Sequence, residues 1–281
     1  MMATRTILDY RSNVRPIWCP GCGDFGVLSS FLKALTDLDI APERVAIASG
    51  IGCSSRFPAF VKAYGFHSVH GRALPLATGI KTANPELTVF AMGGDGDFFS
   101  IGAGHLPHAA RRNVDITCIV MDNEIYGLTK GQPSPTSPLG MTRKASPYGS
   151  IDRPLNPIAM ALSYDTSFIA RAFSARPQEM TEIIKKAIQH KGFSFIQVLS
   201  PCITFFDSYR LFRDITANLP QDHDVGDKMK AMALALDEER LYLGIFYQVE
   251  RVTHDASIVS LHHKAGADGF SLEDLMERFR R

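Results

Sequence analysis

The sequence lacks the features of a membrane, secreted or nucleic-acid-binding protein. No apolar run among its 281 residues approaches the length that crosses a bilayer, and the first residues contain no signal-peptide core. Lys and Arg number 30 against 29 Asp and Glu, so the net charge of +1 offers no basic surface for phosphate backbones. The five cysteines, without a secretory segment, favour metal or redox chemistry in a reducing compartment over a disulfide framework. We therefore expect a cytoplasmic protein, long enough to bury a large core.

The common nucleotide-binding fingerprints are also absent, because neither GxGxxG nor a P-loop pattern occurs. What is present is a central stretch, Leu87–Lys130, in which two apolar runs flank a segment of helical spacing. The runs are Leu87–Met92 and Ile116–Met121, and this order is typical of a right-handed βαβ unit with parallel strands. Such a unit places the ends of both runs at the carboxyl edge of the sheet, where open α/β sheets bind ligands.

Polar residues follow both runs of this unit. Asp95 lies between glycines after the first run, and Asn123 follows the second, so the topology makes them neighbours. Oxygen ligands of this kind suit Mg²⁺, and the glycines beside Asp95 allow a diphosphate to approach the backbone closely. Asp-Gly and Asp-Asn are also common turn dipeptides, so two ordinary turns are the alternative.

The cysteines form one CxxC pair and three single positions. Cys19 and Cys22 flank a Pro-Gly turn, which by itself fits a redox pair, half of a zinc site or half of an iron–sulfur site. Cys53 and Cys202 stand singly beside small or turn-forming residues, which favours a cluster over a zinc ribbon with two CxxC knuckles. Cys118 lies inside an apolar run and is expected to be a core side chain.

These motifs together resemble a known enzyme family. Gly94-Asp95-Gly96 followed by Asn123 looks like the thiamine diphosphate motif, and the run GGDGDFFSIG…HAARRN…IYGLTKGQPSPTSP is similar to the β subunit of 2-oxoacid:ferredoxin oxidoreductases. The nearest branch is that of 2-oxoglutarate and broad-range 2-oxoacid enzymes. The resemblance implies an α/β fold, a mostly parallel sheet sandwiched by helices. It also implies thiamine diphosphate, Mg²⁺ and one 4Fe–4S cluster as cofactors, and CoA and a 2-oxoacid as substrates. The expected partners are an α subunit, in an αβ or α2β2 assembly, and ferredoxin.

The resemblance also assigns roles to individual residues. The expected cluster ligands are Cys19, Cys22, Cys53 and Cys202. The expected Mg²⁺ ligands are Asp95, Asn123 and the carbonyl of Ile125. The expected contacts to thiamine diphosphate are Ile51, Gly52, Cys53, Ser54, His70, Gly96, Asp97, Gly127 and Leu128. The residues expected nearest the reacting groups are Arg56, His70 and Lys130. For Arg56 we expect capture of a second substrate carboxylate, the alternative being a surface arginine at a helix start.

The remaining expectations concern organisation. Residues 1–202 should form the cofactor domain, with Phe193–Leu199 as the last strand, and residues 203–281 an arm that packs on the domain or on the partner. We expect Asp24 to cap a helix, a long loop over Pro133–Pro154, and a helix over Asp227–Leu241. A pyruvate-type or broad-range 2-oxoacid oxidoreductase is an alternative. So are a non-redox thiamine lyase, which needs no cysteine cluster, and a zinc-binding module, which needs neither Asp95 nor Mg²⁺.

Overall fold

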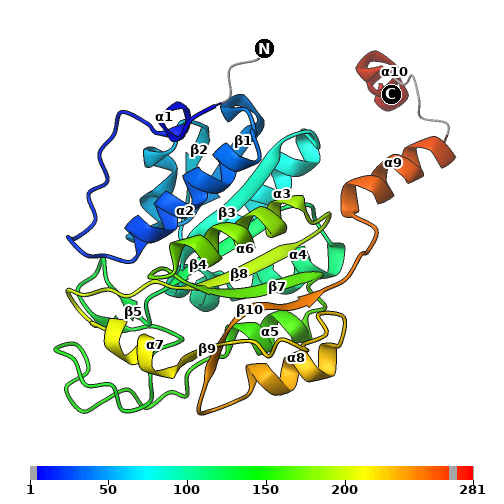
Figure 1. Cartoon of the computed structure of the whole chain (residues 1–281). Helices are drawn as coiled ribbons and strands as arrows, with labels where there is room; N and C mark the ends of the chain where they lie inside the picture. Colours follow the sequence, from blue (N-terminus) through cyan, green and yellow to red (C-terminus); the bar gives the residue numbers. More distant parts are fainter. Residues whose placement is uncertain (1–4, 266–270, 281) are drawn as a thin grey trace.

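The computed structural model describes residues 5–265 and 271–280, and it shows an eight-stranded sheet between layers of helices (Figure 1). The strand order is β2-β1-β3-β4-β8-β7-β10-β9. In chain order the strands are β1 (Val45–Ser49), β2 (Tyr64–His67), β3 (Thr88–Gly94), β4 (Thr117–Asp122), β7 (Phe168–Phe173), β8 (Ser194–Leu199), β9 (Thr216–Asn218) and β10 (Leu241–Gln248). Neighbouring strands run parallel except β7 and β10, which are antiparallel. The expected fold class is confirmed.

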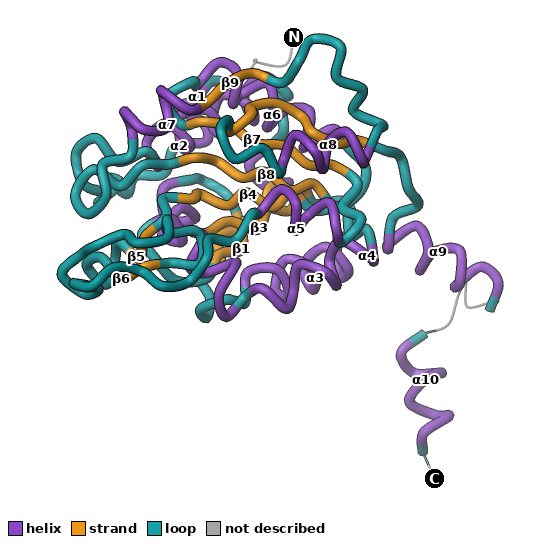
Figure 2. The backbone as a smooth tube through the Cα atoms, turned by 90° about the horizontal axis from the view of Figure 1, so that it is seen from below, coloured by secondary structure: helices purple, strands orange, loops and turns teal. Residues whose placement is uncertain are grey.

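Helices cover both faces of the sheet (Figure 2). One face carries α1 (Ile7–Tyr10), α2 (Asp24–Asp37) and α6 (Pro177–Gln189). The other carries α3 (Ala73–Ala83), α4 (Leu106–Arg112), α5 (Pro157–Ser163) and α8 (Lys228–Ala235). Every residue of β1, β4, β7 and β8 is buried, so these strands carry mostly apolar side chains on both faces rather than an alternating pattern. No helix in the described ranges has the length and apolar character to cross a membrane.

The sheet continues beyond Phe193–Leu199, so the prediction that this is its last strand is wrong. β10 pairs with β7 and β9 pairs with β10, while α7 (Tyr209–Ile215) packs beside them. The predicted helix over Asp227–Leu241 ends early because the residues after it form the strand β10. α8 stops at Ala235, a turn around Asp237 accepts the N–H groups of Glu239 and Arg240, and the chain then enters β10. Pairing with β7 outweighs the local helical pattern.

The end of the chain forms two helices that lie away from the sheet. These are α9 (His254–Lys264), which has no buried residue, and α10 (Leu272–Phe279), whose Ser271 and Asp274 form a capping box. Packing of this segment on a partner remains a prediction.

Two predicted local features differ near the central motif. The segment after Gly96 is not one helix: a π-helical turn over Asp97–Ile101 breaks at Ser100, and a 3-10 turn precedes α4. A side chain at Gly102 would meet the Asp97 carbonyl oxygen at 2.4 Å, so the close turn requires glycine there. Asp24 is the first residue of α2 rather than its cap, since Gly23 holds the cap position.

Candidate functional site

The residues singled out by the sequence lie at one edge of the sheet. β1, β3, β4 and β8 are parallel neighbours, so their carboxyl ends lie side by side. The loops that follow these ends are residues 50–54, 95–97, 123–131 and 200–202. The two-stranded ribbon of β5 (Ile125–Tyr126) and β6 (Gln132–Pro133) extends from this end, while α9 and α10 lie at the opposite end (Figure 2). The topology thus gathers the predicted metal, cofactor and cysteine positions.

Buried carboxyl groups gather around the predicted Mg²⁺ position. Asp95 and Asp122 are each 1 % exposed and share the Thr136 hydroxyl, which lies 3.0 Å from Asp95 Oδ2 and 2.8 Å from Asp122 Oδ1. Burial and the neighbouring Asp122 charge raise the pKa of Asp95, and burial and both aspartates raise that of Glu124. Glu124 Oε2 is buried without a hydrogen-bond partner among the described residues. A divalent cation would offset this repulsion, so the donor set fits Mg²⁺.

The turn after β4 orients the predicted amide ligand. Glu124 adopts a left-handed backbone with φ of 58°, and the Ile125 N–H donates to Asn123 Oδ1 at 3.0 Å. The Asn123 N–H in turn faces Asp95 Oδ1 at 3.4 Å, so the predicted proximity of Asp95 and Asn123 is confirmed. This contact and the turn hold the side chains of Asp95 and Asn123 near the end of β3.

One buried guanidinium lies behind the acidic groups. Arg171 on β7 donates from Nε to Gln197 Oε1 at 2.8 Å, and Gln197 Nε2 donates to Asp122 Oδ2 at 2.8 Å. Burial raises the pKa of Asp122, and the Arg171 charge acts against that shift. A residue of the sheet therefore balances part of the negative charge.

Asp97 joins the loops predicted to contact thiamine diphosphate. Its buried carboxylate accepts the N–H groups of Ile51 at 3.1 Å and Gly71 at 2.7 Å, and His70 Nδ1 lies 2.7 Å from Asp97 Oδ1. A Cβ on Gly50 would fall 2.0 Å from Asp97 Oδ2. Asp97 therefore fixes the loop after β1 and the loop before α3, and it sets the position of His70.

The four predicted cluster cysteines converge at the same edge. An ideal Cβ on Gly127 would lie 3.5 Å from Cys202 Sγ and 3.9 Å from Cys53 Sγ, so both sulfurs face the loop that carries Gly127. Burial raises the pKa of Cys53 to about 11, with the charges of Asp24, Cys202 and Cys19 adding to the effect. Burial also raises the pKa of Cys22, with Asp24, Cys202 and Cys53 adding to it. The position of Cys53 and Cys202 beside one loop, at the edge that also carries the CxxC turn, fits a shared cluster.

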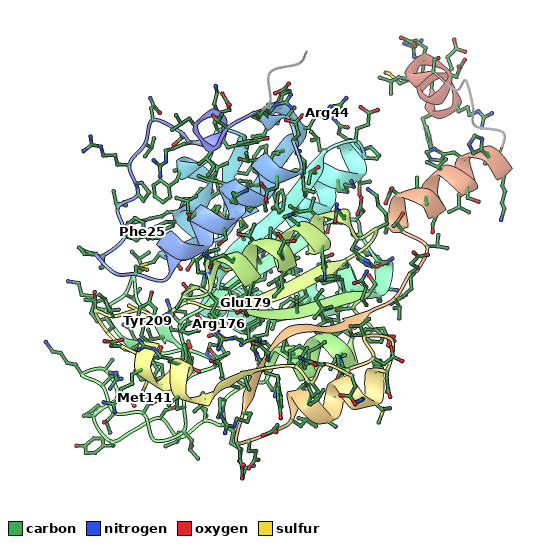
Figure 3. The ribbon with its side chains drawn as sticks, viewed as in Figure 1. Phe25, Arg44, Met141, Arg176, Glu179 and Tyr209 are labelled. Atoms are coloured by element: carbon green, nitrogen blue, oxygen red, sulfur yellow. The ribbon has the colours of Figure 1, made fainter. Side chains whose placement is uncertain are left out.

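The loops that carry these cysteines are held by cross-bonds. Trp18 Nε1 donates to the Cys53 carbonyl at 2.8 Å, and the Tyr209 hydroxyl donates to the Gly21 carbonyl at 3.2 Å. Phe25 packs edge-on against Trp18, and both Phe25 and Tyr209 are labelled at this end of the molecule in Figure 3. Cys118 is fully buried in β4, which confirms its predicted core position.

Asp24 is a site residue that sequence reasoning placed wrongly. Its carboxylate is 1 % exposed and accepts hydrogen bonds from Ser200 Oγ at 2.7 Å and Ser54 Oγ at 3.1 Å. Burial raises the pKa of Asp24 to about 6. Asp24 follows Cys22 by two residues, so these bonds join the CxxC turn to the loops that carry Cys53 and Cys202. An aspartate after CxxC reads as a helix cap, so no local signal distinguishes this role.

The remaining predicted residues lie around the edge. Arg56 sits in the 3-10 turn Ser54–Phe60, where its charge lowers the pKa of Cys53 against the larger effect of burial. Leu128 and Lys130 are exposed on the turn between β5 and β6. Gly96 approaches Tyr126, whose hydroxyl donates to the Gly96 carbonyl at 3.2 Å. Within the described ranges, no three His, Cys, Asp or Glu side chains lie close enough to bind a single metal ion. Ligands of a multi-iron cluster bind different irons, and the expected Mg²⁺ ligands include only one carboxylate.

Two protein-family profiles match the chain. "Thiamine pyrophosphate enzyme, C-terminal TPP binding domain" matches residues 50–198. This range contains the loop 123–131 and the three acidic residues Asp95, Asp122 and Glu124, which we call the acidic centre. A profile for the C-terminal part of the pyruvate ferredoxin oxidoreductase beta subunit matches residues 202–263, from Cys202 into α9.

Individual relatives give the same result. The chain is 42 % identical over 260 residues to subunit beta of 2-oxoacid:ferredoxin oxidoreductase 1 from Aeropyrum pernix, covering 88 % of this chain and 82 % of that protein. It is 45 % identical over 199 residues to the 2-oxoglutarate oxidoreductase subunit KorB of Mycobacterium tuberculosis, covering 71 % of this chain and 53 % of that protein. It also matches a solved structure, 2-oxoglutarate:ferredoxin oxidoreductase from Magnetococcus marinus with 2-oxoglutarate, coenzyme A and succinyl-CoA bound. The TM-score is 0.95 at 41 % identity, covering 100 % of this chain and 97 % of that chain. The chain belongs to the β subunits of the 2-oxoacid:ferredoxin oxidoreductases.

Proposed function

We propose that this chain is the cofactor-binding subunit of an enzyme that converts 2-oxoglutarate and CoA to succinyl-CoA and CO₂, or runs the reverse reaction. Electrons would pass through one 4Fe–4S cluster to ferredoxin, and an α subunit would complete the site in an αβ or α2β2 assembly. The relatives named for 2-oxoglutarate and the solved structure with 2-oxoglutarate, coenzyme A and succinyl-CoA support this substrate.

The observation that carries the proposal is the position of Gly127. This residue belongs to the loop that follows the proposed metal-ligand turn, and a Cβ built on it would lie within 4 Å of the Cys202 and Cys53 sulfurs. When bound, thiamine diphosphate supplies the carbanion that attacks the ketone of a 2-oxoacid, and the cluster supplies one-electron transfer. A thiamine-binding loop that contacts cluster ligands suits a redox enzyme and serves no purpose in a lyase.

The chain's own residues would bind and orient these groups. Asp95, Asn123 and the Ile125 carbonyl would hold Mg²⁺ against the diphosphate, and Cys19, Cys22, Cys53 and Cys202 would hold the cluster. Asp97 would keep Ile51 in place beside the cofactor through a hydrogen bond, and His70 through the 2.7 Å contact of its Nδ1 with the carboxylate. The glutamate that thiamine enzymes hydrogen-bond to the pyrimidine has no recognisable motif here, so we assign it to the α subunit.

Cofactor content tests the proposal directly. The chain is co-expressed anaerobically with its α subunit, and iron, sulfide and thiamine diphosphate are measured. We expect about four irons per chain, a broad brown absorption and one thiamine diphosphate. A complex that contains zinc and no iron would contradict the proposal, because the cysteines would then hold a structural zinc ion. The β subunit purified alone should show no 2-oxoacid-dependent reduction of ferredoxin or viologen.

Arg56 is proposed to select 2-oxoglutarate through its second carboxylate. Arg56→Ala should raise the KM for 2-oxoglutarate about tenfold and change the KM for pyruvate less, since a bidentate guanidinium contact is lost only with the diacid. Arg210→Ala, at a surface arginine of α7, serves as the control. Equal effects on both substrates would support a broad-range or pyruvate-type enzyme instead.

A further inference from the structure

The loop from Pro133 to Pro154 is mostly buried over residues 134–137 and largely exposed beyond them, apart from the buried Met141. Ser134, Thr136 and Ser137 are all less than 10 % exposed, whereas the Tyr148 side chain is almost completely exposed. The Leu155 N–H donates to the Pro135 carbonyl at 2.8 Å, so the far end of the loop returns to its beginning. Met141, labelled in Figure 3, lies within this loop at the end of the molecule where the site is found. The loop is therefore attached to the site through a short polar segment.

That segment is held by the acidic centre. The Thr136 hydroxyl contacts both Asp95 Oδ2 and Asp122 Oδ1. The Ser137 hydroxyl donates to the Glu124 carbonyl at 2.5 Å and receives the Ser134 N–H at 2.7 Å. The loop thus bonds to the end of β3, the end of β4 and the metal-ligand turn. The loop is therefore attached to the acidic centre by polar contacts. The strength of these contacts depends on the charge of the centre.

Thr136 also decides which oxygen of Asp95 is available. Its hydroxyl occupies Oδ2, and the other oxygen, Oδ1, faces the N–H of Asn123. A carboxylate fixed in this way presents one oxygen towards the predicted ligand Asn123 and cannot rotate freely. Removing the hydroxyl would release this orientation and leave two buried carboxylates without their shared donor.

We propose that Thr136 is a positioning residue that couples attachment of the loop 133–154 to binding of Mg²⁺ and thiamine diphosphate. Asp95 and Asp122 repel each other across one hydroxyl, and a divalent cation on Asp95 offsets that repulsion. Cation binding therefore stabilises the Thr136 contacts, and by linkage these contacts strengthen cation binding by the same factor. This inference rests on the proposed function, because it takes Asp95 as the metal ligand.

Cofactor binding in matched variants tests the coupling. The αβ complex is freed of metal and cofactor, and thiamine diphosphate binding is measured by equilibrium dialysis at increasing Mg²⁺ concentrations. Thr136→Val, which removes the hydroxyl at nearly constant volume, should need about tenfold more Mg²⁺ for half-maximal binding. Thr136→Ser should behave like the wild type because it keeps the hydroxyl. Thr142→Val is the control in the same loop, where the side chain is exposed.

A second readout follows the loop itself. Hydrogen exchange of residues 134–137 in the wild-type complex should slow when Mg²⁺ and thiamine diphosphate are added, and it should slow less in Thr136→Val. If Thr136→Val fails to assemble, the coupling is tested by hydrogen exchange in the wild type and by the Mg²⁺ requirement of Thr136→Ser. An unchanged Mg²⁺ requirement in Thr136→Val, a Thr136→Ser variant as weak as valine, or exchange that ignores the cofactor would each overturn the coupling. A wild-type complex that binds no thiamine diphosphate would instead overturn the proposed function.

Discussion

Asp24 shows how one buried carboxylate can organise a site that its neighbours in sequence do not reveal. It accepts hydroxyl groups from Ser54 and Ser200, and the latter lies 176 positions away in the chain. Desolvating a carboxylate is costly unless such donors compensate, and the raised pKa of about 6 reflects that cost. In return, the group joins three cysteine-bearing segments.

Replacing Asp24 should therefore loosen the cysteines. Asp24→Ala leaves two buried hydroxyls without their acceptor, and we expect the free energy of unfolding to fall by about 2 kcal/mol and iron per chain to drop. Asp24→Asn keeps one acceptor oxygen and should lose less of both. Thermal unfolding and iron analysis of the αβ complex measure the two effects. Asp222→Ala, at a surface aspartate, is the control, and iron retention in Asp24→Ala equal to that control would contradict this role.

His190 makes stability depend on acidity. Its ring is buried beside Ser167, with Nε2 2.8 Å from Ser167 Oγ, and burial lowers the pKa of His190 below its usual value. Below about pH 6.5 the unfolded chain binds a proton at His190 more readily than the folded chain does. The contribution of His190 to the free energy of unfolding is therefore present above about pH 6.5 and is lost as the pH falls below it. The loss is at most about 1.4 kcal/mol per pH unit. His190→Gln should remove this component, seen as a smaller drop in Tm between pH 7.5 and 5.5 than in the wild type.

At the scale of elements, Asn113 joins the ends that face away from the site. It closes α4 in a left-handed conformation with φ of 50°, and its Oδ1 accepts from the Phe193 N–H at 2.9 Å and Ser167 Oγ at 2.6 Å. Its Nδ2 donates to the Arg251 carbonyl at 3.1 Å. One side chain thus connects α4, the starts of β7 and β8, and the segment after β10.

Asn113→Gly tests this connection without straining the backbone. Glycine tolerates the positive φ, so the change isolates the lost side-chain bonds. We expect the free energy of unfolding to fall by about 2–3 kcal/mol, from several buried bonds at about 1 kcal/mol each. Chemical denaturation measures it. Thiamine diphosphate affinity of the αβ complex should not change, and a large loss of affinity would mean that this end of the sheet communicates with the site.

The elements that sequence predicts well are those whose pattern is local. Leu87–Met92 and Ile116–Met121 become β3 and β4, and the turns after them bring Asn123 to Asp95, because parallel topology fixes which strand ends meet. The Thr136 contacts with Asp95 and Asp122 are not predictable in this way, since they depend on how a 22-residue loop returns across the sheet edge. β10 is not predicted because the residues that lead into it have a helical pattern, which pairing with β7 outweighs.

At the scale of the whole molecule, the two ends of the sheet have different surfaces. The carboxyl end carries the loops 50–54, 95–97, 123–131 and 200–202, with the exposed Leu128 and Lys130. The opposite end leads into α9 and α10, which project from the body in Figures 1 and 2. The exposed side chains of α10 include Leu272, Met276 and Phe279, which share one face of the helix at spacings of four and three residues. An amphipathic helix with an exposed apolar face is most simply explained by contact with another chain.

We therefore predict that α10 contributes to subunit assembly and not to folding of this chain. Substituting Leu272, Met276 and Phe279 with Ser should leave the Tm of the β subunit within about 2 °C, because these side chains are exposed, and should weaken association with the α subunit about tenfold or more. Sedimentation of the mixed subunits measures the dissociation constant. Glu273→Gln with Glu277→Gln, which leave the apolar face intact, is the control. If association is unchanged while the Tm falls, the helix packs against its own domain, and the arm stabilises this chain rather than the assembly.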